Sequence, residues 1–365
     1  MSSKTSADNK KKLQVAIVGS GNWGSAIASH IGEKVRSSGK DQFEEKISMW
    51  CKEEDVDGEK ITELINRTHE NKKYLPDHKI SDNVVAIPDL KEAVKDADIL
   101  VFVVPHQFLK KTCEEMKGNI KQNAFALSLI KGFYVDDKTN DILLISEVIK
   151  NTLNIDCLTM MGANIAKEVA AKVFCEATIG TKNKEHSTII KSLIDSDKFR
   201  LRFFPDVEII EMLGALKNII AMIAGFSEGL ECGFNTRAAI LRLGLREMIE
   251  FCRLYHKESS YEIYLESCGM ADLVASSLGG RNYDSAKKFV QTNKSLKEIE
   301  EEDLNGQSLQ GPGTAEEVYR ILKNKNLLDR FPLLRDAHLI CDQKIKPKQL
   351  TDNLGNHPEF QTNQQ

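Results

Sequence analysis

The stretch "VGSGNWGSAIA", from Val18 to Ala28, is the sequence feature that most restricts what this chain can fold into. Its glycines have the spacing G-x-G-x-x-G. The apolar run "LQVAIVG" (13–19) leads into them and predicts a strand buried on both faces, and a helix-compatible stretch follows from Ser25 to about Val35. Such a motif is specific mainly when it joins a strand to a helix. Its context here therefore predicts the phosphate-binding turn of a dinucleotide fold.

Each glycine has a physical role in such a turn. Gly19 would make the tight turn, Gly21 would let the backbone approach a pyrophosphate, and Gly24 would let the helix pack closely on the sheet. The free N–H groups and positive dipole end of the helix would attract the phosphates. The alternative is a structural corner that binds no ligand. We expect a cofactor to contact the residues of the turn, namely Gly19, Ser20, Gly21, Asn22, Trp23 and Gly24.

The choice between NAD and NADP depends on the end of the second predicted strand, "ISMW" (47–50). The segment "WCKEED" offers Glu53 or Glu54 to a ribose 2′-hydroxyl, although both lie further from the glycines than the usual spacing of about 20 residues. No arginine neighbours this strand end, which favours NAD. Lys52 weakens that argument, because a lysine there could tolerate a 2′-phosphate. The sequence predicts NAD as the cofactor.

Strands and helices alternate through the first part of the chain. Buried apolar runs predict strands at 47–50, 98–105, 124–132, 157–164 and 199–206. Helix-compatible segments separate these runs, and "DILLISEVIKNTL" (141–153) is one of the predicted helices. Alternation of this kind predicts an α/β fold with a Rossmann-type doubly wound parallel sheet.

The pattern changes near Phe204, after which almost every segment has helical period. The segment 207–226 is apolar nearly all round, as expected for the central helix of an all-helical substrate domain. A second long helix is expected at 235–256, with Asn235 or Thr236 as its N-cap. We divide the chain into a disordered arm (1–12), a dinucleotide-binding Rossmann domain (13–204), a helical substrate and catalytic domain (205–345) and a loosely packed tail (346–365).

Charge and cysteine usage exclude several classes of partner. The 365 residues carry a formal net charge of −4, so neither nucleic acid nor an anionic membrane surface is expected as a partner. The apolar run "ILVFVV" (99–104) is much too short to span a bilayer. The eight cysteines include no C-x-x-C pair, and no secretory leader precedes them. We therefore expect reduced thiols, a cytoplasmic location and no metal site.

Lys217 has the most informative surroundings of any charged residue in the sequence. Its helical neighbours three and four positions away are uncharged: Leu213, Gly214, Ile220 and Ala221. One interpretation is a lysine that extends along its own methylene groups to water. The other is a buried ammonium group whose pKa falls towards neutrality, which suits proton transfer. Asp272 could hold that ammonium group in place, and Asn218 beside the lysine could orient a hydroxyl group.

Polar side chains also follow three predicted strands, where a parallel sheet binds its ligands. His106 and Phe108 follow one strand, Lys131 the next and Asn164 a third. His106 is more readily explained as a capping or surface residue than as a catalyst, and Phe108 could pack on a cofactor or in the core. Lys131 is either an ordinary strand-end charge or a substrate contact.

The segment "GGRN" (279–282) places exposed glycine backbone next to Arg281. A planar guanidinium group matches a phosphate with two parallel hydrogen bonds. The plain alternative is a glycine turn with an arginine on the surface. The sequence therefore offers a phosphate site here but does not decide between the two.

Several of these segments together resemble one family. "VAIVGSGNWGSAIA", "HENKKYLP", "DADILVFVVPHQF", "SLIKG", "MGANIAKEV", "GGRN" and "LNGQSLQGP" are similar, in the same order, to NAD-dependent glycerol-3-phosphate dehydrogenases of the eukaryotic cytosolic type. The resemblance runs from about Leu13 to Pro358. It implies reversible reduction of dihydroxyacetone phosphate, a phosphorylated triose, by NADH to sn-glycerol 3-phosphate. It also implies a homodimer.

The resemblance assigns roles to individual residues. Lys217 falls on the family's catalytic lysine, which would protonate the carbonyl oxygen in reduction and accept the hydroxyl proton in oxidation. The substrate-site or proton-network positions fall on Lys131, Asn164, Asn218 and Asp272. The phosphate-binding pair matches Arg281 and Asn282, with Arg281 also near the cofactor. The remaining cofactor contacts match Phe108, Ala166 and Gln310.

Two positions depart from the family pattern. Ser308 stands where family members carry a lysine on a mobile cofactor loop, and Ser276 replaces a threonine but keeps a hydroxyl group.

Two other functions stay open from the residues alone. A 3-hydroxyacid or hydroxyacyl dehydrogenase would share the two-domain plan, yet "GGRN" would then have no purpose. A non-catalytic NAD-binding sensor would have no need of Lys217, Asp272 and Arg281 together.

Overall fold

The strand that precedes the glycine turn is β1 (Leu13–Val18), which lies inside an eight-stranded sheet of order β12-β11-β10-β7-β6-β1-β2-β5. Its residues from Val15 onward are fully buried, as the continuous apolar run predicts. The computed structural model describes residues 11–292, 294–304 and 308–361. The first ten residues of the predicted disordered arm therefore lie outside the described residues.

Six strands of the sheet run parallel. They are β1, β2 (Phe43–Trp50), β5 (Val84–Ile87), β6 (Ile99–Phe102), β7 (Phe125–Ser128) and β10 (Asp156–Met161). Their spatial order, β5-β2-β1-β6-β7-β10, is the 3-2-1-4-5-6 order of dinucleotide-binding sheets. The winding direction reverses between β1 and β6, and ligands bind at the carboxyl ends of strands beside such a reversal. The predicted fold class is confirmed.

The other two strands reverse direction. Strand β11 (Cys175–Gly180) pairs antiparallel with β10, and β12 (Phe199–Phe204) pairs parallel with β11. The sequence predicted β12 as part of a uniformly parallel sheet, and it did not predict β5 or β11. The connection from β10 to β11 contains only the five-residue helix α6 (Ala166–Ala170). A chain this short between neighbouring strands favours an antiparallel return over a full helical crossover.

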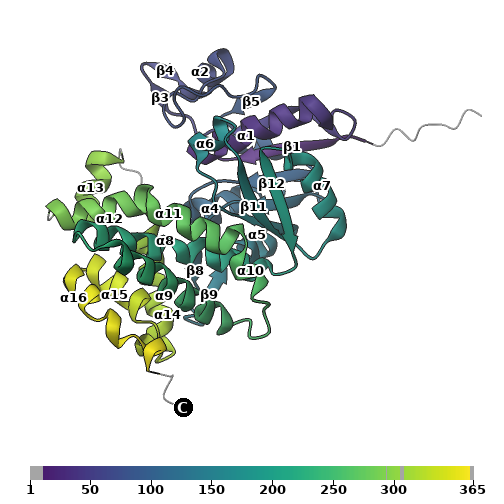
Figure 1. Ribbon diagram of the computed structural model, residues 1–365. Helices are drawn as coiled ribbons and strands as arrows, with labels where there is room; N and C mark the ends of the chain where they lie inside the picture. Colours follow the sequence, from purple (N-terminus) through teal and green to yellow (C-terminus); the bar gives the residue numbers. More distant parts are fainter. Residues whose placement is uncertain (1–10, 293, 305–307, 362–365) are drawn as a thin grey trace, which may run out of the picture.

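Helices cover both faces of the sheet (Figure 1). Side chains of α1 (Asn22–Lys34), α2 (Ile61–Thr68) and α7 (Lys184–Ile194) enter the core on one face. Those of α3 (Leu90–Val94), α4 (His106–Met116) and α5 (Ile145–Leu153) enter the core on the other. Two smaller pieces complete this lobe, the hairpin β3 (Asp55–Val56) and β4 (Glu59–Lys60), and a π-helical turn at Val35–Gly39.

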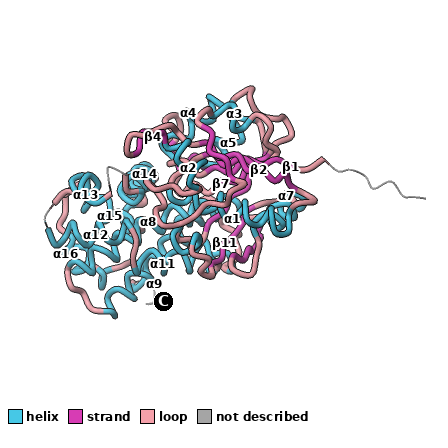
Figure 2. The backbone as a smooth tube through the Cα atoms, turned by 90° about the horizontal axis from the view of Figure 1, so that it is seen from above, coloured by secondary structure: helices cyan, strands magenta, loops and turns pink. Residues whose placement is uncertain are grey.

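The second lobe is built around α8 (Val207–Gly229), which is buried from Ile209 to Ser227. Figure 2 shows this lobe as helices at one end of the molecule and the strands at the other. Of the helices in the described ranges, α8 is the one long and apolar enough to span a bilayer, and its most apolar window is entirely buried inside the protein. Its composition is therefore explained by its central position in the core.

Shorter helices surround α8. They are α9 (Phe234–Arg253), α10 (Glu262–Leu265), α11 (Asp272–Leu278), α12 (Arg281–Thr292), α13 (Leu296–Asp303), α14 (Gln310–Asn324), α15 (Pro332–Cys341) and α16 (Pro347–Asp352). A π-helical turn at Ser267–Ala271 precedes α11, and 3-10 turns lie at Leu328–Arg330, Leu354–Asn356 and Pro358–Phe360. No strand follows Phe204 in the part of the chain that the structure describes.

The segment 141–153 is not one helix, as the sequence predicted. It begins as β9 (Ile142–Leu144), which forms an antiparallel hairpin with β8 (Phe133–Val135), and α5 begins only at Ile145. Three apolar residues before a helix cannot be told from a helical turn by periodicity. The hairpin forms because its side chains enter the hydrophobic cores of both lobes.

Two further expectations about the second lobe are wrong. The N-cap of α9 is Gly233, not Asn235 or Thr236, because the helix begins one residue earlier than expected. The chain after 346 is not loosely packed up to residue 361: Leu350 is 2% exposed and His357 is 5% exposed. The tail packs because the imidazole of His357 binds Glu247, a carboxylate buried in the helical lobe.

Candidate active site

The glycine turn has the geometry that a bound pyrophosphate requires. Gly19 has a φ of 120°, which favours glycine, and a Cβ on Gly24 would stand 2.2 Å from the carbonyl oxygen of Gly19. A Cβ on Gly21 would meet nothing within 4 Å. Gly21 is also the N-cap of α1, so the helix begins with N–H groups that no side chain caps. Space and donors therefore coincide in front of Gly21, as they do in a phosphate site.

Two asparagines complete the turn. The amide Nδ2 of Asn71, a fully buried residue, donates to the Ser20 carbonyl at 2.7 Å and to the Ser25 hydroxyl at 2.9 Å. Asn22 Oδ1 is buried and has no hydrogen-bond partner among the described residues. A buried polar atom without a partner is costly unless a ligand or water completes it. The turn thus fits a dinucleotide. The role of Asn71 was not predicted, because nothing in the sequence links it to a turn fifty residues earlier.

The two carboxylates that the sequence offered to a ribose are engaged within the chain. Glu53 accepts from the Thr62 hydroxyl at 2.8 Å, and Glu54 accepts from the Tyr74 hydroxyl at 2.7 Å and from Lys73. Burial alone would raise the pKa of Glu54, but these two donors hold it below its usual range. Both residues therefore hold the loop region beyond β2 through these hydrogen bonds.

A row of three charged side chains joins the two lobes. Lys217 of α8 is 7% exposed, and its Nζ lies 2.9 Å from Asp272 Oδ1. Lys131, which follows β7, places its Nζ 2.6 Å from Asp272 Oδ2 and 3.2 Å from the Gly162 carbonyl. The hydroxyl of Ser276 accepts from Lys217 and donates to Asp272 Oδ1 at 3.3 Å. Two cations thus share one carboxylate, which leaves an excess of one positive charge.

The pKa values of this row follow from burial and from charge. Burial, against the attraction of Asp272 and with a smaller contribution from the nearby Lys131, lowers the pKa of Lys217 to about 8. Burial alone would raise the pKa of Asp272, but Lys131 and Lys217 together hold it below its usual range. Asp272 is therefore a carboxylate at neutral pH, while Lys217 can gain or lose a proton near it.

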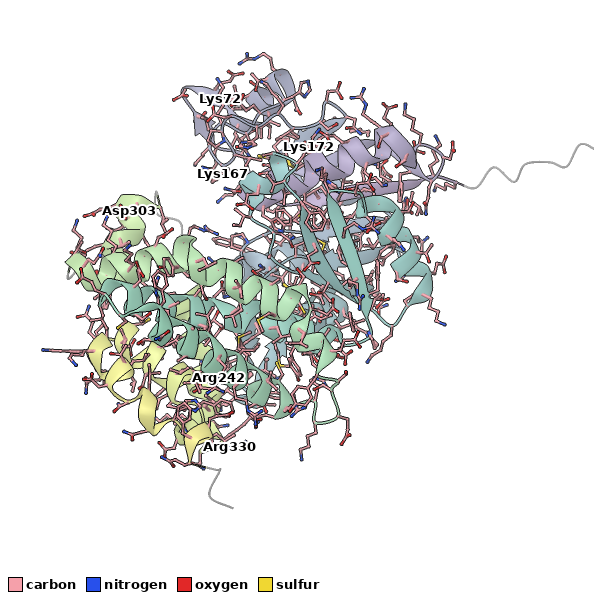
Figure 3. The ribbon with its side chains drawn as sticks, in the orientation of Figure 1. Lys72, Lys167, Lys172, Arg242, Asp303 and Arg330 are labelled. Atoms are coloured by element: carbon pink, nitrogen blue, oxygen red, sulfur yellow. The ribbon has the colours of Figure 1, made fainter. Side chains whose placement is uncertain are left out.

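The buried row contrasts with the other charged groups of the two lobes. Figure 3 labels six of these, Lys72, Lys167, Lys172, Arg242, Asp303 and Arg330, all of which lie on the outside of the molecule and are exposed. By contrast, the side chains of Lys217 and Asp272 are buried, so water has little access to either of them. A buried ammonium group where two lobes meet is a functional-site candidate on physical grounds.

A second network lies next to Lys217 and reaches the predicted phosphate pair. Asn282 Nδ2 donates to Asn218 Oδ1 at 3.0 Å, and Asn282 Oδ1 accepts from the Gly311 backbone N–H at 3.0 Å. Arg281 begins α12 directly after Gly280, whose φ is 102°. The three helices α8, α12 and α14 therefore meet at Asn282, beside the exposed side chain of Arg281.

Of the remaining predicted residues, Asn164, Phe108 and Ala166 follow strands of the sheet and Gln310 lies in the helical lobe, and no hydrogen bond joins any of them to Lys217 within the described residues. Asn164 binds the Glu176 carbonyl through its amide at 2.9 Å. Phe108 is 56% exposed in the first turn of α4, while Ala166 begins α6 and Gln310 begins α14. Ser308 is exposed, and residues 305–307 before it lie outside the described residues.

His106 is close to the row without touching it. Its ring lies against Gly132, where a Cβ would stand 3.2 Å from Nδ1, and its carbonyl accepts from the Tyr134 hydroxyl. Burial lowers the pKa of His106, so the ring is neutral at pH 7. His106 does not cap α4, because Pro105 is the N-cap of that helix, and Nδ1 of His106 has no hydrogen-bond partner in the described part of the chain.

The sheet order, the glycine turn and the buried lysine row together define a two-domain dinucleotide-dependent dehydrogenase. Comparison with known proteins specifies the family. Residues 14–187 match the family model described as the N-terminus of NAD-dependent glycerol-3-phosphate dehydrogenase, and residues 206–352 match that of its C-terminus. The chain therefore belongs to the NAD-dependent glycerol-3-phosphate dehydrogenase family.

Individual relatives agree over nearly the whole chain. The cytoplasmic glycerol-3-phosphate dehydrogenase [NAD(+)] of Drosophila ezoana is 51% identical and covers 96% of this chain and 99% of its own length. The human glycerol-3-phosphate dehydrogenase 1-like protein is 49% identical over 95% of this chain and 98% of its own. A solved glycerol-3-phosphate dehydrogenase from Saccharomyces cerevisiae has a TM-score of 0.84 and 39% identity, with 94% of this chain and 99% of that chain covered.

Proposed function

We propose that this chain interconverts dihydroxyacetone phosphate and sn-glycerol 3-phosphate, with NADH and NAD as cofactors and Lys217 as proton donor and acceptor. The observation that carries the role of Lys217 is its burial at 7% exposure with its Nζ 2.9 Å from Asp272. NADH held at the glycine turn supplies the hydride. In reduction, the Lys217 ammonium group gives its proton to the carbonyl oxygen, and in oxidation the neutral amine accepts the hydroxyl proton.

We assign Asp272 and Lys131 to the same step. The Asp272 carboxylate orients the Lys217 ammonium group through Oδ1, which fixes the direction in which the proton leaves. Lys131 brings a second positive charge to Oδ2, so the row favours negative charge on the substrate oxygen as the reaction proceeds. Because Lys131 also lowers the pKa of Lys217, it makes the proton easier to transfer.

The phosphate group of the substrate is proposed to bind at the start of α12. Arg281 supplies a planar pair of donors there, and Asn282 donates one N–H to Asn218 and carries a second for a phosphate oxygen. We assign Asn218 and Asn164 to the substrate as well. The cofactor contacts proposed beyond the glycine turn are Phe108, Ala166, Arg281 and Gln310.

A substrate comparison tests this function. NADH oxidation by the full chain is measured with dihydroxyacetone phosphate, with unphosphorylated dihydroxyacetone, and again with NADPH. We expect turnover only with the phosphorylated triose, and faster turnover with NADH than with NADPH. Equal rates for the two trioses contradict the anion site, and the absence of any NADH oxidation contradicts the proposed function.

Replacement of Arg281 tests the phosphate site itself. In Arg281→Met the KM for dihydroxyacetone phosphate should rise about tenfold to a hundredfold, which is the effect of losing a hydrogen bond to a charged group. The exposed Arg242, on the far side of the helical lobe, supplies the matched control as Arg242→Met. If KM is the same in both variants, the phosphate does not bind at Arg281.

Three properties of the whole protein are also proposed. We place the domain boundary between the end of β12 at Phe204 and the start of α8 at Val207. A cytoplasmic location is supported by the names of the Drosophila relatives and by eight free cysteines.

A homodimer is supported by exposed apolar side chains on neighbouring elements of the helical lobe, namely Leu265, Met270, Val274 and Leu278. Light scattering on the wild type and on Leu278→Asp tests it, and a wild-type mass of one chain contradicts it.

A further inference from the structure

The β8–β9 hairpin lies between the two lobes and begins two residues after Lys131. Figure 1 shows β8 and β9 beside α8 and α9. One face of the hairpin is buried in the core of the helical lobe through Phe133, Val135 and Leu144. The other face packs on the core around α4 and α5 through Tyr134 and Leu143. The ring of Phe133 stacks on Phe251 of α9 with the ring centroids 6.4 Å apart.

Lys131 stands at the point where the chain leaves the sheet for this hairpin. Strand β7 ends at Ser128, and Gly132, with a φ of 138°, turns the chain towards β8. The Lys131 ammonium group contacts Asp272 on the helical side and the Gly162 carbonyl on the sheet side. The position of the Lys131 backbone therefore depends on the hairpin that follows it as well as on strand β7, which precedes it.

Asp141 fixes the far end of the hairpin to the helical lobe. Its Oδ2 lies 2.6 Å from Lys325 Nζ, at the end of α14, and its Oδ1 accepts the hydroxyl of Tyr255, just after α9. Burial alone would raise the pKa of Asp141, but Lys325 and Tyr255 hold it below its usual range, so the group is a carboxylate at neutral pH. A two-stranded hairpin has little stability by itself, so anchors at its ends decide how firmly it is held.

We propose that the β8–β9 hairpin is the positioning element of Lys131, and that Asp141 is the residue that fixes this element to the helical lobe. The inference rests on the proposed function, because its effect is measured as a change in the rate of the proposed reaction. With the anchor in place, Lys131 stays beside Asp272 and Lys217 as part of the helical lobe. Without it, the hairpin is held by its buried side chains alone, and the contact between Lys131 and Asp272 becomes weaker.

The experiment is a double-mutant cycle with the full chain. Asp141→Asn keeps the size of the side chain and removes its charge, and Lys325→Met removes the partner instead. The matched control is Glu250→Gln, a carboxylate of similar exposure in the same lobe that binds Arg246 and Arg330. Each change is made in the wild type and in Lys131→Met. The measurements are kcat and kcat/KM for reduction against pH, the Kd for NADH, and Tm.

We expect Asp141→Asn and Lys325→Met to lower kcat about threefold in the wild type and to leave the Kd for NADH unchanged, consistent with the loss of one partly exposed ion pair. In Lys131→Met neither change should lower kcat further, because its effect passes through Lys131. The charged groups that face Lys217 are Asp272 and Lys131, and Lys131 lowers the pKa of Lys217. The alkaline limb of kcat/KM should therefore move to higher pH.

Two results overturn the inference while the proposed function stands. One is an unchanged kcat in both Asp141→Asn and Lys325→Met. The other is the same loss of kcat in the wild type, in Lys131→Met and in Glu250→Gln, which would mean a general loss of stability. A wild type that does not reduce dihydroxyacetone phosphate contradicts the proposed function instead. Measurement of Tm for each variant identifies any that fails to fold.

Discussion

At the scale of single residues, the chemistry depends on how one carboxylate is shared. Asp272 gives Oδ1 to Lys217 and Oδ2 to Lys131, so neither lysine has the whole negative charge. Burial then outweighs the remaining attraction and lowers the pKa of Lys217 to about 8. An ammonium group with that pKa changes its protonation state close to physiological pH, which is the condition for efficient proton transfer in both directions.

This pKa predicts opposite pH dependences for the two directions of the reaction. Reduction needs the protonated lysine, so its kcat/KM should fall as pH rises through about 8. Oxidation needs the neutral amine, so its kcat/KM should rise through the same range. Initial rates at low substrate concentration, taken over roughly two pH units on either side of that midpoint, measure both limbs. Two limbs that move in the same direction contradict the assignment.

Removal of the amine predicts a loss of turnover without a loss of cofactor. In Lys217→Met, turnover should fall by about 10²- to 10⁴-fold, the usual contribution of a positioned acid or base. The Kd for NADH should change little, because the glycine turn is in the other lobe. Lys184→Met, an exposed lysine on α7, is the matched control. Normal turnover in Lys217→Met removes this residue from the mechanism.

Single residues differ in how far the sequence predicts them. Lys217 is recognisable because its uncharged neighbours lie within one helical turn. The Gly162 carbonyl, which accepts from Lys131, and Asn71, which supports the glycine turn, are not recognisable in this way. Their contacts join residues that are remote in the chain, and no local pattern records such a contact.

At the scale of elements, the junction of β1 and α1 separates two effects that glycine has in one motif. At Gly24 the absence of a side chain serves packing, because a Cβ would collide with the Gly19 carbonyl at 2.2 Å. At Gly21 it leaves open space, because nothing lies within 4 Å of the Cβ position. The same glycine pattern therefore allows close packing at one position and leaves space at the other, which we assign to the cofactor.

This difference predicts distinct effects for two alanine substitutions. Gly24→Ala should lower the free energy of unfolding by roughly 1–3 kcal/mol or more, because backbone must move to accept the methyl group. Gly21→Ala should leave Tm within about a degree and raise the Kd for NADH about tenfold or more, because its methyl group stands in the phosphate site. Thermal unfolding and NADH titration separate the two. Equal effects on Tm contradict this assignment.

Elements with a strong pattern are predicted from the sequence, and short ones are not. The strands β1 and β6 follow from continuous apolar runs, and the helices α8 and α9 follow from length and helical period. The strand β11, "CEATIG", mixes polar and apolar residues, and the three-residue strands β8 and β9 depend on tertiary packing. A strand of three residues has no period of its own to detect.

At the scale of the whole molecule, the end of the chain holds two helices of the second lobe together. Glu247 of α9 is 1% exposed and accepts from the Leu333 and Leu334 backbone N–H groups at the start of α15. His357 adds a third donor, with its Nε2 3.0 Å from Glu247 Oε1. This contact could not be predicted from the sequence, because the tail is polar and has no apolar periodicity.

This contact predicts that the tail stabilises the fold. His357→Ala should lower the free energy of unfolding by about 1–3 kcal/mol, because a buried carboxylate loses one of its donors. Its kcat should stay near the wild-type value, because the residue is remote from Lys217. The control for denaturant unfolding is His78→Ala, because the ring of His78 binds the carbonyl of Pro76, two residues away in the chain. A tail that can be altered at His357 without loss of stability contradicts this role.

The central position of α8 has one more consequence. The helix that supplies the hydrophobic centre of one lobe also carries, near its midpoint, the amine assigned to the reaction. A partly denatured form that has lost the helical lobe cannot retain turnover, even if its sheet still binds nucleotide. During heating or denaturant titration, the remaining activity should therefore follow the fraction of molecules whose second lobe is folded. The fluorescence of bound NADH should follow the fraction whose first lobe is folded.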